Sequence, residues 1–250
     1  MTYAEFSLVC SLIKQIVDNV MPLDNPTKTL AVTTADKVFE QIQHAIVEGD
    51  ILAGSKISEP ELAKQYQVSR STLREALNRL EKCHLVERKP NVGSRVVECS
   101  IKGLLELYIT REALEGMACR QAAENMTDEE IVDMKAMLSQ HSTAQDLQDG
   151  VAYYQEKGDL DFHYKVILGS HNAQLINLIC GQLYHLVRMY RCQFGMNSPR
   201  ASRAFSEHSR IIEAISDRDG ELAELLMRRH IAASRKNIEN KIAEQNKLNQ

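Results

Sequence analysis

The sequence predicts a mostly α-helical protein with two domains: an N-terminal winged helix-turn-helix, with a small β-hairpin as its wing, and a C-terminal all-α bundle of six antiparallel helices. Three observations lead to this fold class. A chain of 250 residues with 44% hydrophobic composition can bury two cores. Strand-like patterning is confined to a short stretch near residue 90, and apolar residues recur at helical spacing almost everywhere else.

The first 33 residues form an N-terminal extension in which apolar side chains recur at helical spacing among polar ones, which predicts an amphipathic helix. The chain contains no run of eighteen apolar residues, so we expect no membrane partner. The six cysteines form no CxxC pair and have no regular spacing, which indicates reduced thiols in a cytoplasmic protein.

Residues 34–98 carry the predicted helix-turn-helix. A helix is expected over 35–48, and a two-turn helix over 59–66 is followed by a three-residue turn ending at Ser69. The Ser69 side chain can cap a helix that begins at Arg70, in which Leu73, Leu77 and Leu80 share one face. Two short helices joined in this way predict a DNA-binding motif whose second helix enters the major groove.

A hairpin is predicted directly after this motif. Residues 85–88 and 94–97 are the expected strands, and Pro90 and Gly93 mark the turn between them. From Ser69 to Arg95 the sequence has seven basic and three acidic residues, although the whole chain carries a net charge of -4. A local basic surplus on an acidic chain favours a surface that contacts phosphate in one domain only.

Residues 101–244 predict helices with a single proline, Pro199, in the whole segment. Thr127 and Glu130 have the spacing of a capping box at the start of the second of these helices. The expected helices cover about 101–125, 127–147, 151–170, 172–195, 201–216 and 219–244.

Four polar residues of this domain have a spacing that suits a metal site. Asp159 and His163 lie four apart on one predicted helix, so their side chains share a face. His208 and His230 are equidistant from residue 219 in the turn of a predicted hairpin, which places them at the same height on neighbouring helices. Together they can supply four ligands to a divalent ion in a bundle core, although each histidine alone is more simply a polar residue on a helix surface.

The N-terminal pattern VSRSTLREALNRLE, followed by LVERKPNVGSRV, resembles the GntR family of bacterial transcription regulators. The resemblance implies a double-stranded operator as partner and DNA contacts from the second helix and the wing. The chain departs from the family pattern at Pro60, where an arginine is common. The expected contact residues, including a wing lysine, are Ser69, Arg70, Ser71, Thr72, Arg74, Lys89 and Gly93.

The segments DLDFHYKVILGSHN, SEHSRIIEAISDRD and ELAELLMRRH resemble the FCD effector-binding domain of the FadR subfamily, and six helices are closer to its VanR-like branch. The resemblance implies metal ligands at Asp159, His163, His208 and His230. It also implies an effector-binding arginine at Arg111, for which an ion pair with Glu115 is the alternative. Arg188, with Arg191, is a weaker candidate for the same task.

These expectations combine into one function. The chain is predicted to be a ligand-responsive regulator, and a repressor is expected, that acts as a homodimer on near-palindromic operator DNA. Its C-terminal domain would bind a small carboxylate metabolite at a divalent metal ion, zinc or alternatively nickel. Two rival functions stay open at this point: a metal-dependent hydrolase that uses the Asp/His3 site, and a regulator that senses the metal itself.

Overall fold

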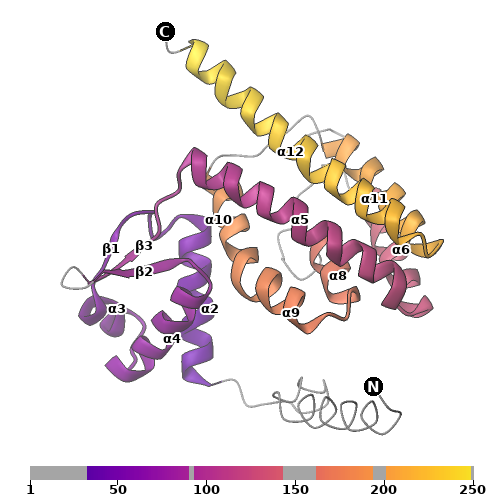
Figure 1. Cartoon of the computed structure of the whole chain (residues 1–250). Coiled ribbons are helices and arrows are strands. Elements are labelled where there is room, and N and C mark those ends of the chain that lie inside the picture. The colour runs from indigo at the N-terminus through magenta and orange to yellow at the C-terminus, as the bar shows by residue number, and fades with distance from the viewer. Residues whose placement is uncertain (1–32, 90–92, 143–161, 194–200, 249–250) are drawn as a thin grey trace, which may run out of the picture. The chain divides into compact units, whose positions relative to one another are not determined.

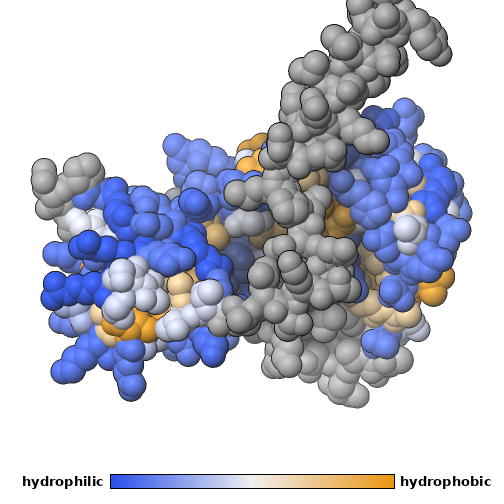
Figure 2. Space-filling view, turned by 90° about the horizontal axis from the view of Figure 1, so that it is seen from below, coloured by the Kyte–Doolittle hydropathy of each residue, from blue (hydrophilic) through white to orange (hydrophobic). Residues whose placement is uncertain are grey.

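The computed structural model describes residues 33–89, 93–142, 162–193 and 201–248. From Ala35 onward these residues belong to one compact unit. The amphipathic helix predicted within the first 33 residues lies outside the described part. Among the described helices, none is long and apolar enough to cross a membrane. Figure 2 shows mostly hydrophilic residues on one face of the described surface, with scattered hydrophobic ones.

Three helices build the N-terminal motif: α2 (Thr34–Glu48), α3 (Glu59–Gln65) and α4 (Arg70–Lys82). Helix α4 begins where the sequence predicts, because the Ser69 hydroxyl accepts a hydrogen bond from the Thr72 amide at 3.1 Å. Leu73, Leu77 and Leu80 are fully buried in a core shared with α2. The helix therefore turns its apolar face inward and leaves its polar start exposed.

The wing is a three-stranded antiparallel sheet in the order β1-β3-β2, made of β1 (Lys56–Ile57), β2 (Val86–Lys89) and β3 (Gly93–Val96). The hairpin of β2 and β3 was predicted, and its strands lie one residue from the expected bounds. Strand β1 was not predicted, because two residues are too short to show a period of two. Lys89 pairs with Gly93, whose φ of +98° favours glycine at the strand start.

The described residues of the C-terminal part form helices joined by short turns, and the two longest helices, α5 and α12, lie side by side (Figure 1). The predicted helix over 172–195 is instead three consecutive segments, the middle one a π-helix, η2. The helical elements are α5 (Ile101–Asn125), α6 (Asp128–Ser142), α8 (Phe162–Gly169), α9 (Ala173–Ile176), η2 (Asn177–Leu183), α10 (Tyr184–Gln193), α11 (Ala201–Ser216) and α12 (Gly220–Leu248).

The hairpin of α11 and α12 is fixed at its turn. Asp219 caps α12 by accepting a hydrogen bond from the Leu222 amide at 2.9 Å. Arg218, at a φ of +61°, donates to the Met126 carbonyl at the end of α5 and to Asp128 at the start of α6, both at 2.6 Å. These bonds hold the turn against two other helices, which fixes the height of residues along the hairpin.

Candidate metal centre and DNA-binding surface

Three histidines from three helices meet in the interior of the helical domain. His163 of α8, His208 of α11 and His230 of α12 are 5%, 3% and 5% exposed. The Nε2 atom of His230 lies 3.2 Å from Nε2 of His208 and 3.2 Å from Nε2 of His163. The hairpin thus brings His208 and His230 level, as their distance from the turn predicts, and the three rings form a group that could hold a metal ion.

Carboxylates fix the orientation of two of these rings. Nδ1 of His163 lies 2.7 Å from Oε2 of Glu115, and Nδ1 of His230 lies 2.7 Å from Oε2 of Glu207. An ionised carboxylate only accepts hydrogen bonds, so the Nδ1 atom of each ring donates to its carboxylate, and the Nε2 atom is the one left to bind a metal ion. The Nε2 atoms of the three rings lie together in the interior, which is the arrangement that ligands of one cation require.

The spacing also suits a small divalent ion. Zinc binds imidazole nitrogen at about 2.0–2.1 Å, and two ligands at a tetrahedral angle are then about 3.3 Å apart. The two Nε2 separations of 3.2 Å agree with this value. Phe162 stacks on the His208 ring with centroids 4.1 Å apart and holds it in place. Asp159, the fourth predicted ligand, lies outside the described residues.

Glu115 links the histidines to a buried arginine. Its Oε1 atom accepts from Nε of Arg111 at 2.5 Å, and the two side chains are 2% and 4% exposed. Burial alone would raise the pKa of the Glu115 carboxyl, but the Arg111 guanidinium and the His163 ring outweigh it and hold that pKa well below its usual range. The ion pair weighed as the alternative role of Arg111 is therefore present.

The second arginine predicted for effector binding has a different neighbour. Nη2 of Arg188 on α10 lies 3.5 Å from Oε1 of Glu48 on α2, an ion pair between the helical domain and the DNA-binding motif. The side chain of Arg191 lies outside the described set. Helix α10 also places Met189, which is fully buried, in the core of the DNA-binding motif, and Sγ of Cys83 donates to the Gly181 carbonyl at 3.2 Å.

Sequence reasoning missed both carboxylates as partners of the histidines. Glu115 was named only for its i, i+4 spacing from Arg111, and it lies 48 positions from His163. Glu207 directly precedes His208, yet it contacts His230 on the neighbouring helix. Sequence spacing carries no signal for either contact, since both depend on how the helices pack.

The predicted DNA-contacting residues gather at the start of α4 and on the wing. Ser69, Arg70, Ser71 and Arg74 are exposed, while Thr72 is half-buried and its hydroxyl lies 2.8 Å from that of Ser69. Exposed polar side chains at the start of the second helix suit contacts in a major groove.

Two of these cations are held by acidic neighbours. Arg74 donates from Nε to Glu59 of α3 at 2.9 Å, a contact that the sequence did not reveal. On the wing, Nζ of Lys89 lies 2.9 Å from Glu87, and Gly93 is exposed. Pro60 occupies the first turn of α3, where it fits a helix start.

A winged helix-turn-helix joined to a helical domain with a buried polar site is the architecture of a DNA-binding regulator with a sensory domain. Comparison with known families agrees: residues 34–96 match the bacterial regulatory proteins of the gntR family, and residues 106–233 match the FCD domain. The chain belongs to the GntR family of bacterial regulatory proteins and carries an FCD domain. It is thus a transcription regulator and not an enzyme, which removes the hydrolase alternative.

Curated relatives have matching descriptions. The chain is 29% identical over 205 residues to the HTH-type transcriptional regulator BphR of Paraburkholderia xenovorans, covering 80% of this chain and 82% of that protein. It is also 29% identical over 217 residues to a probable D-xylose utilization operon repressor of Paenarthrobacter nicotinovorans, covering 84% and 92%. Among solved structures, Escherichia coli McbR/YncC aligns with a TM-score of 0.61 at 19% identity, over 84% of this chain and 99% of that one, which shows a shared fold.

Proposed function

We propose that this regulator is a homodimeric repressor whose FCD domain binds a divalent metal ion, zinc in the first place, and responds to a small carboxylate. One observation carries the metal: the Nε2 atoms of His163 and His230 lie 3.2 Å apart in the interior, and Nε2 of His208 lies at the same distance from Nε2 of His230. Asp159 is the proposed fourth ligand. Three imidazoles and a carboxylate suit zinc, and nickel also accepts imidazole.

The protein's own groups define what the site can recognise. A bound divalent ion supplies a Lewis acid that attracts the carboxylate of the effector. Arg111 uses Nε for Glu115, so its two Nη groups are the ones we assign to the other end of the ligand. Burial of Arg111, Glu115 and the histidines excludes water, which strengthens each charge interaction at the site.

Helix α10 is the proposed connection to DNA. Its Met189 belongs to the core of the DNA-binding motif, and the η2 segment before it packs against α8, which bears His163. A ligand that favours one position of α8 can therefore shift the position of the recognition helix. This coupling requires that the ligand bind two states of the protein with different affinity. The relative described as a probable operon repressor supports repression rather than activation. We infer a cytoplasmic location from the proposed binding to operator DNA.

The experiment is His208→Ala in the full chain, with His171→Ala as matched control because His171 is an exposed histidine paired with Glu130. We expect His208→Ala to lose zinc on purification by metal analysis, to bind operator DNA with wild-type affinity, and to show no shift of operator affinity with a panel of small carboxylates. The control should keep all three properties. Retention of both zinc and the carboxylate response by His208→Ala would refute the proposed site.

The same titration of operator binding tests the alternative that the protein senses the metal ion alone. Operator binding is measured against free zinc with no carboxylate present, and then against carboxylates at saturating zinc. We expect operator affinity to change only in the second series. A change that follows free zinc and ignores every carboxylate would instead support metal sensing.

A further inference from the structure

A groove between α11 and α12 has a charge pattern that the metal site does not use. It is a cavity of about 290 Å³ with residues of both helices along its sides, among them Arg203, Glu207, Arg210, Leu226, Arg229 and His230. Glu207, which lies 2.7 Å from Nδ1 of His230, lines this cavity, whereas His163 and His208, which face Nε2 of His230, do not. The groove is thus a space distinct from the metal-binding side of the ring.

The lining is strongly cationic. Three guanidinium groups accompany a single carboxylate, and that carboxylate is engaged by His230 at 2.7 Å and lies 3.4 Å from Nε of Arg203. Neither Arg210 nor Arg229 forms an ion pair with any residue that the structure describes. Two exposed arginines that have no acidic partner among the described residues therefore line one small cavity.

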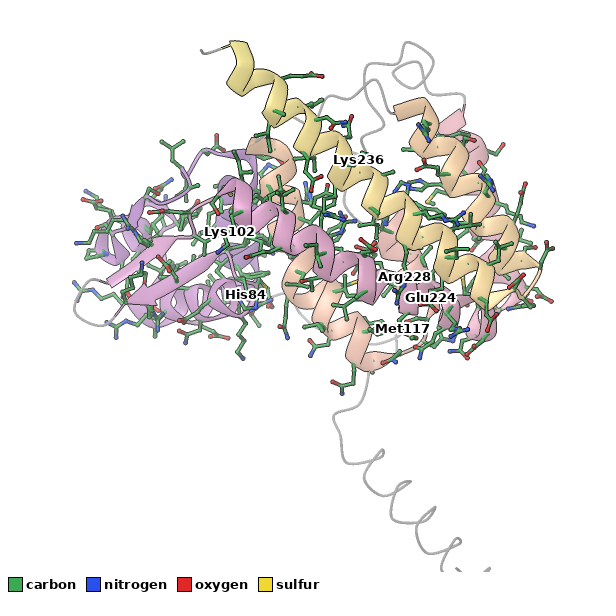
Figure 3. All side chains as sticks on the ribbon, turned by 45° about the horizontal axis from the view of Figure 1, so that its top comes forward. His84, Lys102, Met117, Glu224, Arg228 and Lys236 are labelled. Atoms are coloured by element: carbon green, nitrogen blue, oxygen red, sulfur yellow. The ribbon has the colours of Figure 1, made fainter. Side chains whose placement is uncertain are left out.

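The opposite side of α12 shows that this is a local feature. Arg228, the neighbour of Arg229 in sequence, lies toward α5 and pairs with Glu224 at 2.9 Å (Figure 3). Arg235, further along α12, pairs with Glu239 at 3.3 Å. These two arginines have acidic partners from the protein, whereas Arg210 and Arg229 of the groove have none among the described residues and leave room for an acidic partner from solution.

We propose that this groove binds a compact dianion with a negative group at each end, such as a short dicarboxylate. Arg210 of α11 and Arg229 of α12 line the cavity from its two helices, so their side chains can meet the two ends of such a ligand. The planar fork of arginine matches a carboxylate with two parallel hydrogen bonds. The cavity is at the lower end of the range for ligand pockets, about 300–1,000 Å³, which favours a small molecule.

The test is calorimetric titration of the metal-depleted full chain with succinate at low ionic strength, beside butyrate as a monoanion of similar length. We expect succinate to bind at least about tenfold more tightly than butyrate, and Arg210→Gln and Arg229→Gln each to weaken succinate about tenfold. Arg228→Gln is the matched control, since it removes the same charge from the other face of α12, and it should bind succinate like the wild type. Unchanged thermal unfolding would confirm that each variant is folded.

Three outcomes would overturn the groove site: equal affinity for succinate and butyrate, wild-type succinate affinity in both groove variants, or an equal loss in Arg228→Gln. A fourth separates this proposal from the proposed metal site. If succinate binds only after zinc is restored, the dianion binds at the metal, the groove proposal is wrong, and the proposed function stands. Conversely, groove binding in a chain that never retains zinc would support the groove alone.

Discussion

Replacing Glu115 by glutamine should destabilise the protein far more than a surface substitution does. Arg111 and Glu115 are 4% and 2% exposed, so the change leaves a guanidinium buried without its counter-charge. Breaking a buried ion pair from one side costs about 3–5 kcal/mol. For a unit of this size, each kcal/mol shifts the melting temperature by about 2–4 °C, so we expect a drop of about 6–20 °C.

A double variant separates the role of Glu115 in stability from its role toward the histidines. Arg111→Met combined with Glu115→Leu buries neither charge and should regain most of the lost stability. It also leaves Nδ1 of His163 without the carboxylate that orients the ring, so zinc affinity should fall about 10–100-fold. The Glu115→Gln variant keeps an oxygen that can accept the hydrogen bond from Nδ1 of His163, so it should lose less zinc affinity than the double variant.

The measurements are thermal and urea unfolding followed by circular dichroism in the presence of a chelator, and competitive zinc titration of the folded proteins. The reasoning fails if Glu115→Gln loses less than about 1 kcal/mol, because the pair would then be compensated by other groups. It also fails if the double variant binds zinc like the wild type, since Glu115 would then have no part in orienting His163.

Two further predictions concern DNA. Arg74→Ala should weaken specific operator binding by about 1–3 kcal/mol with little change in salt dependence, because Glu59 holds this exposed arginine at the start of the recognition helix. If the ratio of specific to random DNA binding stayed unchanged and about one unit of salt slope were lost, Arg74 would be a phosphate contact instead. The protein should sediment as a homodimer at micromolar concentration, because one recognition helix covers only a half-site; a monomer that binds a single half-site with full affinity would contradict this.

Local patterns in the sequence were sufficient for the helix-turn-helix and for the level pair of histidines. Ser69 and the leucine spacing act within one or two turns of α4, and the position of His208 opposite His230 follows from the geometry of a hairpin. Features that depend on contacts between distant parts of the chain could not be predicted from local sequence patterns. Strand β1 exists because β3 pairs with it, and nothing in residues 172–195 distinguishes a π-helical segment from an α-helix by its apolar spacing.

The charged contacts of the site show the same division. Glu115 was visible as a partner of Arg111, four residues away on the same helix, and its second oxygen meets His163 only because α8 packs on α5. Arg188 was predicted to bind effector from its place in the sequence, whereas its guanidinium lies beside Glu48 of another element. Contacts within a helix follow from spacing, but contacts between helices depend on packing that spacing alone does not determine.

Because Met189 of the helical domain is buried in the core of the DNA-binding motif, the helical domain cannot simply be exchanged for another sensory domain. A fragment that ends near residue 98 would lose the side chain that closes its own core, together with the Gly181 carbonyl that accepts from Cys83. A different sensory domain joined to this DNA-binding motif would need a helix that places an apolar residue at the position of Met189. The two domains therefore meet at a packed surface, and recombination at the loop that joins them would not preserve that surface.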